Sequence, residues 1–300
     1  MPAIINQRVY RPPWLAKLSA LACLLALSAC SLVVTGYNSA PNLLMFLWIN
    51  PHVDLNAAQE KQTLADLKLT LEWHRQNQLP LYADVLKQMQ ELAPNEINPD
   101  QVCAIAEVIN VSLDPLIEQF EWPLTKLALS LNADQLQTLE RKYQQDLKDY
   151  RKEWKLDASR DKQLDVQTDK GQTNAERLYG SLSTAQEKLL RQLAQDSGYE
   201  PERTYAERIR QQKESLALHE RILQTKPDAQ EAKAMVRKWL QSSLHSSDSA
   251  YAAYLKKRKR SNCEASSQLH NTTTPEQRAR AVKVLKGYED DVRTLMRKKS

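Results

Sequence analysis

Apolar side chains recur at steps of three and four residues between Leu136 and Trp154, and this period limits the structures that the segment can form. The stripe consists of Leu136, Leu139, Tyr143, Leu147, Tyr150 and Trp154, with charged residues on the other positions. Residues three and four apart lie on one face of an α-helix. The pattern therefore predicts a long amphipathic helix over 132–154 that packs on another helix, within the chain or in a second copy.

The rest of the chain favours helices as well. Five glycines and two phenylalanines occur in 300 residues, whereas hairpins need glycine and strands favour aromatic and β-branched residues. Further helices are predicted over 56–78, 184–196, 201–225 and 228–244, and from residues 80, 98, 114 and 274 onward. We therefore expect the all-α class: a multi-helix bundle of long amphipathic helices.

The N-terminal segment has the features of a secretory signal. A basic start without acidic residues precedes the apolar run 18–27. This run is too short to span a bilayer, which needs ~20 apolar residues. The segment ends in the small residues Leu27, Ser28 and Ala29, followed by Cys30.

Leu27-Ser28-Ala29-Cys30 resembles the lipobox of bacterial lipoproteins, in which the cysteine is acylated and becomes the first mature residue. The resemblance implies a lipoprotein signal peptide over 1–29, a lipidated tether over 30–40 and membrane attachment through Cys30. The next residue is Ser31 rather than the aspartate of an inner-membrane retention signal, so we expect the outer membrane, with the protein facing the periplasm. The alternative is an ordinary signal site with an incidental cysteine.

The mature part, 41–300, is predicted to be a single helical domain. Segment 156–173 loses the apolar period and is the best candidate for an exposed loop and a domain boundary. Segment 41–49 is strongly apolar but too short to span a membrane. We expect it to be a helix in the core, and contact with lipid beside the anchor is the alternative.

The charge of the mature chain gives no case for nucleic-acid binding. Residues 1–29 hold three basic residues and no acidic one, so their removal lowers the formal net charge from +5 to +2. The basic run 256–260 is interpreted as a solvated helix end that leads into a polar connection up to Thr274. Contact of this run with anionic lipid is the alternative.

Two cysteines, Cys103 and Cys263, remain besides the signal and the anchor. No histidine or cysteine stands at metal-ligand spacing from them. The sequence leaves a disulfide and two unpaired thiols open, and we predict the disulfide because the periplasm is oxidising.

Three segments share the pattern Leu-(Ser/Thr/Asn)-x-x-Gln, although the third has Thr273 in place of leucine. In each, a cap residue and a glutamine three positions later predict a capping box at a helix start; the pairs are Asn132 with Gln135, Ser183 with Gln186, and Thr274 with Gln277. The pattern also has a faint similarity to the Leu-Thr-x-x-Gln motifs of periplasmic stress chaperones, but no copy here is complete.

A wider set of residues carries a second resemblance. It consists of Tyr37-Asn38, Trp48, Val53-Asp54, Gln59, Trp73-His74-Arg75, Gln78-Leu79-Pro80, Tyr82, Thr274–Gln277, Tyr288 and Val292. With these the chain resembles a family of proteobacterial lipoproteins defined only as a domain of unknown function. The resemblance implies a helical envelope lipoprotein and no particular activity.

The sequence contains no motif for metal, nucleotide or nucleophilic chemistry. His74 continues an apolar helix face with Leu67 and Leu71, so a buried structural histidine is expected there. We assign no catalytic residue, no metal, no cofactor and no small-molecule substrate. The function expected is a non-enzymatic structural or protein-interaction role with an unknown envelope protein. The alternatives are a periplasmic chaperone or stress sensor, and an undetected hydrolase.

Overall fold

The structure is a computed structural model that describes residues 36–297. All elements within this range are helical and none is a strand, so the all-α prediction is confirmed. Residues 36–44 are helical and continue into η1 (Met45–Ile49) and α2 (Asn50–Val53). The others are α3 (Ala57–Asn77), α4 (Leu79–Leu92), α5 (Pro99–Val111), α6 (Leu113–Ser130), α7 (Ala133–Glu153), α8 (Arg160–Tyr179), α9 (Thr184–Asp196), α10 (Pro201–Thr225), α11 (Ala229–Leu244), α12 (Ser249–Asn271) and α13 (Pro275–Arg297).

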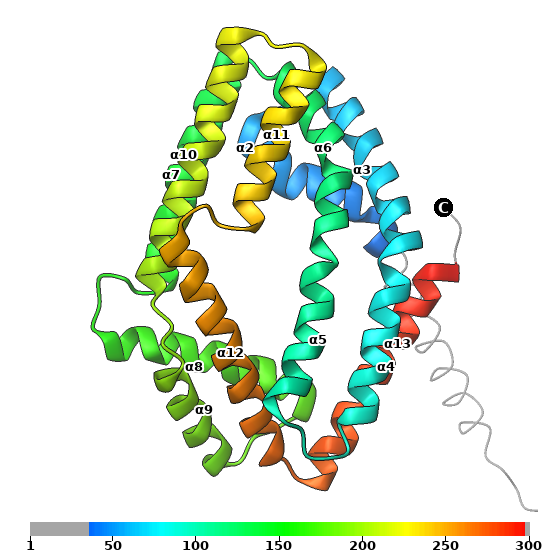
Figure 1. The fold of residues 1–300 in the computed structure, drawn as a ribbon, viewed down its shortest axis with the longest axis vertical. Coiled ribbons are helices and arrows are strands. Elements are labelled where there is room, and N and C mark those ends of the chain that lie inside the picture. The colour runs from blue at the N-terminus through cyan, green and yellow to red at the C-terminus, as the bar shows by residue number, and fades with distance from the viewer. Residues whose placement is uncertain (1–35, 298–300) are drawn as a thin grey trace, which may run out of the picture.

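The chain folds back on itself about α8 and α9, and the helices on either side of this hairpin pair in reverse order. Helix α7 packs on α10, α6 on α11, α5 on α12 and α4 on α13. In Figure 1, α7 and α10 run along the upper left edge, whereas α4 and α13 lie on the right. The pairs are therefore nested, and each connects segments farther apart in the sequence than the pair inside it.

Apolar side chains gather in several clusters rather than in one central core. One cluster joins the N-terminal helix to α3, α6 and α7 through Met45, Leu67, Leu131 and Leu139. A second lies between α6, α10 and α11, and a third lies between α4 and α13. Each cluster is stabilised by removal of apolar area from water where two to four helices meet.

The predicted stripe on α7 packs inside the molecule. Tyr150 is buried, and its hydroxyl donates to the carbonyl oxygen of Pro201 at 3.2 Å. Tyr143 and Trp154 are half-buried; the Tyr143 hydroxyl lies 2.9 Å from Oγ of Ser215, and Trp154 packs on Tyr199. The partner face belongs to α10 and the turn before it, so the stripe is an intramolecular seam.

The prediction of an exposed loop over 156–173 is wrong, because α8 begins at Arg160 and covers most of this segment. The inner face of α8 is formed by Leu164, Gln167, Gly171 and Ala175, which are three or four residues apart. This face is small or polar at its centre. Sequence periodicity does not detect such a helix, since it counts apolar side chains.

The prediction that a polar connection follows the basic run 256–260 is also wrong. Helix α12 continues without a break through 256–260 to Asn271, and Cys263 is buried within it. The tether expected over 30–40 is helical in its described part, 36–40. The expectation that 41–49 is buried in the core fails as well, since most of its large side chains are exposed.

Candidate functional site

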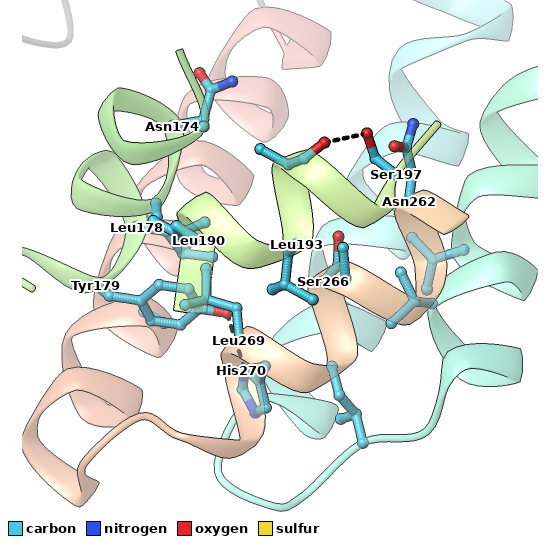
Figure 2. Close-up of a pocket in the computed structure, with 18 of the residues that line it drawn as sticks. Asn174, Leu178, Tyr179, Leu190, Leu193, Ser197, Asn262, Ser266, Leu269 and His270 are labelled. Atoms are coloured by element: carbon cyan, nitrogen blue, oxygen red, sulfur yellow. Dashed lines mark hydrogen bonds between the residues drawn. The ribbon is translucent and has the colours of Figure 1, made fainter. Parts of the chain in front are cut away.

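A cavity of about 630 Å³ lies where α8, α9 and α12 meet, with α4, α5 and α13 completing its walls. Figure 2 shows Leu190 and Leu193 from α9, Leu178 from α8, and Ser266 and Leu269 from α12 around it. The lining is predominantly apolar. Cavities of this size and character are typical of small-molecule sites.

The lining residues on α12 follow the helical period. Arg258, Asn262, Ala265 and Leu269 are separated by steps of four, three and four, and all four line the cavity. They therefore occupy one face of the helix. Sequence reasoning missed this site because it treated 256–260 as one charged group. The signal that would have separated Arg258 from its neighbours is its register with Leu269.

Arg258 is the positive charge of the cavity. Its guanidinium donates to the carbonyl oxygen of Ser197 at 2.8 Å and to Oδ1 of Asn262 at 3.2 Å, and it stacks over the ring of Tyr199. No carboxylate among the described residues forms an ion pair with it. Arg258 is half-buried, and burial lowers the pKa of its guanidinium because the charged form loses part of its hydration.

Gln167 on α8 supplies a second polar group of the lining. Its Nε2 donates to Oγ of Ser197 at 2.8 Å and to the carbonyl oxygen of Ala194 at 3.2 Å. Its Oε1 is buried and has no hydrogen-bond partner among the described residues. Gln167 and Arg258 both donate to Ser197, so the two polar groups are close together at one end of the cavity.

Tyr179 and His270 form a neutral pair elsewhere on the wall (Figure 2). Nε2 of His270 lies 2.9 Å from the carbonyl oxygen of Asn95, so this nitrogen carries the proton and donates. Nδ1 then accepts from the Tyr179 hydroxyl at 2.9 Å. Burial lowers the pKa of His270 and raises the pKa of Tyr179 to about 12, so both are uncharged at neutral pH.

The predicted capping boxes are formed at the starts of α7, α9 and α13. Asn132, Ser183 and Thr274 accept from the backbone N–H of Gln135, Gln186 and Gln277, and each glutamine accepts from the N–H of its cap residue. The structure adds two boxes of the same kind at the starts of α3 and α5, with Gln59 and Gln101.

Four of these glutamines are joined in pairs that the sequence did not reveal. Nε2 of Gln59 donates to Oε1 of Gln135 at 3.1 Å, and Nε2 of Gln135 donates to Oε1 of Gln59 at 2.6 Å. Each side-chain amide also donates to a backbone carbonyl just before its partner's helix: Gln59 donates to Ser130 and Gln135 donates to Asp54. We call this arrangement the Gln59–Gln135 clasp.

A second clasp repeats this geometry between α9 and α13. Gln186 and Gln277 exchange hydrogen bonds of 2.8 and 3.1 Å, and they donate to the carbonyl oxygens of Thr272 and Ser181. In both clasps the accepting carbonyl stands two residues before the partner's cap residue. The motif glutamines therefore join helix starts that are distant in the sequence.

Cys103 on α5 and Cys263 on α12 are disulfide-bonded, with their Cα atoms 5.4 Å apart. Lys259 and Arg260 pair with Glu107 and Asp100 of α5 near this bond. Part of the basic run therefore faces α5, and the solvated helix end expected for it is not formed.

Several of the residues that carry the resemblance to the family of unknown function hold the N-terminal helix in position. The Tyr37 hydroxyl lies 2.8 Å from Nδ1 of His74, and Nη2 of Arg75 donates to Oδ1 of Asn38 at 2.8 Å. The Arg75 guanidinium also lies over the Tyr37 ring. Burial lowers the pKa of His74 and raises the pKa of Tyr37 to about 12. His74 is therefore a structural contact of the first helix.

Leu27, Ser28, Ala29 and Cys30 lie outside the described residues. Within 36–297 no group of three or more metal-ligating side chains comes together. No helix in this range is long and apolar enough to cross a membrane.

Over residues 36–297 the chain is a disulfide-bonded, all-α protein whose nested helix pairs carry a partly open, predominantly apolar cavity. Residues 51–242 match the model of a family described as a family of unknown function (DUF6279), and the chain belongs to this family. No curated protein and no solved structure matches the chain.

Proposed function

We propose that this chain is a non-enzymatic binding protein of the bacterial cell envelope. Acyl chains on Cys30 hold it at the periplasmic face of the outer membrane, and the α8–α9–α12 cavity binds an amphiphile with an acyl chain and an anionic head group. The observation that carries the binding role is Arg258, a half-buried cation without a carboxylate partner on the wall of an apolar cavity.

The two ends of such a ligand match the two kinds of surface in the cavity. Leucine, methionine and alanine side chains would remove an acyl chain from water. A carboxylate or phosphate would offset the desolvated charge of Arg258, whose planar guanidinium suits both groups.

Two features support the envelope location. The sequence that ends at Cys30 has the form of a lipobox, and the Cys103–Cys263 disulfide suits an oxidising compartment such as the periplasm.

In cells, Cys30→Ala is expected to abolish acyl labelling and to remove the protein from the outer-membrane fraction. An unchanged distribution, with no acyl label on either protein, would contradict the anchor.

Ligand binding is tested with the mature chain from Ser31, which lacks the acylation site, and a dansyl-labelled long-chain fatty acid. Arg258→Gln should weaken binding about tenfold or more, since it removes a charge-assisted contact. Lys257→Gln is the matched control, because it removes an exposed charge next to Arg258 that does not line the cavity. Ala265→Phe fills the cavity and should block binding. Equal affinity of the parent chain and the three variants for the fatty acid would refute the proposal.

The protein-interaction and chaperone alternatives have separate tests. Crosslinking in intact cells would trap an envelope protein if the main role is an interaction. Suppression of aggregation of an unfolded client by the purified chain would favour the chaperone.

A further inference from the structure

The N-terminal helix presents a continuous apolar surface to solvent. Leu43, Leu44, Phe46, Leu47 and Trp48 are 49, 46, 57, 71 and 66% exposed. We call these five residues the N-terminal apolar face. Soluble proteins rarely leave so many neighbouring large apolar side chains uncovered, and such patches mark contacts with a partner or a membrane.

The helix is covered on one narrow stripe only. Pro41, Met45, Ile49 and Val53 recur at steps of four; Pro41, Met45 and Val53 are buried and Ile49 is half-buried. Met45 and Val53 belong to the cluster with Leu67 and Leu139, and Ile49 packs against it. The N-terminal apolar face occupies the rest of the circumference, so the described helices leave it without a cover.

This helix is fixed to the body of the protein at both ends. At its start, Tyr37 and Asn38 bind His74 and Arg75. Near its end, Nε2 of His52 lies 3.0 Å from Oδ2 of Asp146 on α7. The face is therefore held on a rigid support, and the molecule presents it in one orientation.

The composition of the segment suits a lipid surface. Residues 36–51 contain no aspartate, glutamate, lysine or arginine. Insertion of the face would therefore bury no full charge in the bilayer. Trp48 combines an apolar ring system with an N–H donor, and tryptophan is enriched at the boundary between lipid and water.

We propose that the N-terminal apolar face inserts into the periplasmic leaflet of the membrane beside the lipid anchor. This inference rests on the proposed acylation of Cys30. Six residue steps separate Cys30 from Gly36, and a chain of that length spans at most roughly 20 Å. From Gly36 to Leu43 the helix rises only about 10 Å. The anchor therefore keeps the face close to the bilayer, where interfacial helices bury their apolar side roughly 5–10 Å deep.

The test uses the full acylated chain reconstituted in vesicles of phosphatidylethanolamine and phosphatidylglycerol. Leu47→Cys carries an environment-sensitive nitrobenzoxadiazole probe, and Leu255→Cys, an exposed leucine on α12, is the matched control. Lipids with a spin label on the acyl chain quench fluorophores that enter the bilayer. We expect the probe at residue 47 to lose fluorescence and the probe at residue 255 to keep it.

Equal quenching at the two positions would overturn the inference. A blue-shifted probe at residue 47 that the spin-labelled lipids do not quench would overturn it too, because a second copy or another protein would then cover the face. The labelling also tests the anchor separately: Cys103 and Cys263 are bonded, so a probe found on Cys30 means that acylation failed. Acylated Cys30 together with an unquenched residue 47 leaves the anchor intact and rejects insertion alone.

Discussion

Gln135→Glu should destabilise the fold although it preserves the capping box. Glutamate at this helix position still accepts the N–H of Asn132, as it does in ordinary capping boxes. It has no N–H, however, and loses the hydrogen bonds to Asp54 and Gln59. A box that only caps a helix would tolerate the change, whereas the Gln59–Gln135 clasp would not.

The magnitude follows from the burial of the clasp. Gln59 and Gln135 are each 6% exposed, so water does not replace the missing donors. Loss of the donor leaves the Asp54 carbonyl oxygen unsatisfied, which costs about 1–3 kcal/mol. Oε1 of Gln59 keeps the N–H of Asn56, so the lost bond to Gln59 costs only about 0.5–1.5 kcal/mol. We therefore expect the free energy of unfolding to fall by about 1.5–4.5 kcal/mol.

The measurement is urea unfolding of both proteins, with Gln101→Glu as the matched control. Gln101 forms the same capping box at the start of α5, but within residues 36–297 its side chain exchanges no hydrogen bond with another glutamine. This control should change stability by less than about 1 kcal/mol. The deficit of Gln135→Glu should shrink in acid, where a protonated glutamate regains one donor. Equal effects of the two substitutions would refute the clasp.

Three further predictions concern stability. Replacing Cys103 and Cys263 by serine should lower the free energy of unfolding by about 2–5 kcal/mol, read from urea unfolding without reductant; a stability equal to that of the parent would contradict a bond across the α5–α12 pair. Burial lowers the pKa of His270, so below about pH 6.5 the unfolded chain takes up a proton at this residue before the folded chain does. The free energy of unfolding should therefore fall with acidification, and a free energy of unfolding that rises would contradict a buried, neutral His270. Trp154→Ala should cost about 2 kcal/mol, because the ring is half-buried against Tyr199, and a thermal melt that equals that of the exposed control Trp48→Ala would contradict the seam.

Local signals in the sequence predicted the helices well. The α7 stripe and the three capping boxes each depend on residues a few positions apart, and the structure has helices at those places. The pairing of those boxes was not predictable. Gln135 meets Gln59 across 76 residues, and no short pattern records which helix starts lie side by side.

The cavity and the N-terminal apolar face were missed for different reasons. Small and polar residues such as Gly171 and Asn262 interrupt the apolar lining of the cavity, so the helix faces that form it show no continuous apolar period. A short apolar run such as 41–49 predicts burial by composition alone. Exposure of Leu47 depends on which helices cover it, and that is a property of the complete fold.

The nested pairing of helices suggests an order of folding. The α8–α9 hairpin closes a short loop, and each later pair adds one helix on each side of a loop that is already closed. Direct contact between α4 and α13 would instead have to close about 200 residues at once, as the Gln90–Glu289 bond with its separation of 199 residues illustrates. We therefore expect the chain to close outward from its middle, with α13 docking last. If the chain is exported and acylated at Cys30 as proposed, its N-terminal helices would already be anchored at the membrane before α13 docks.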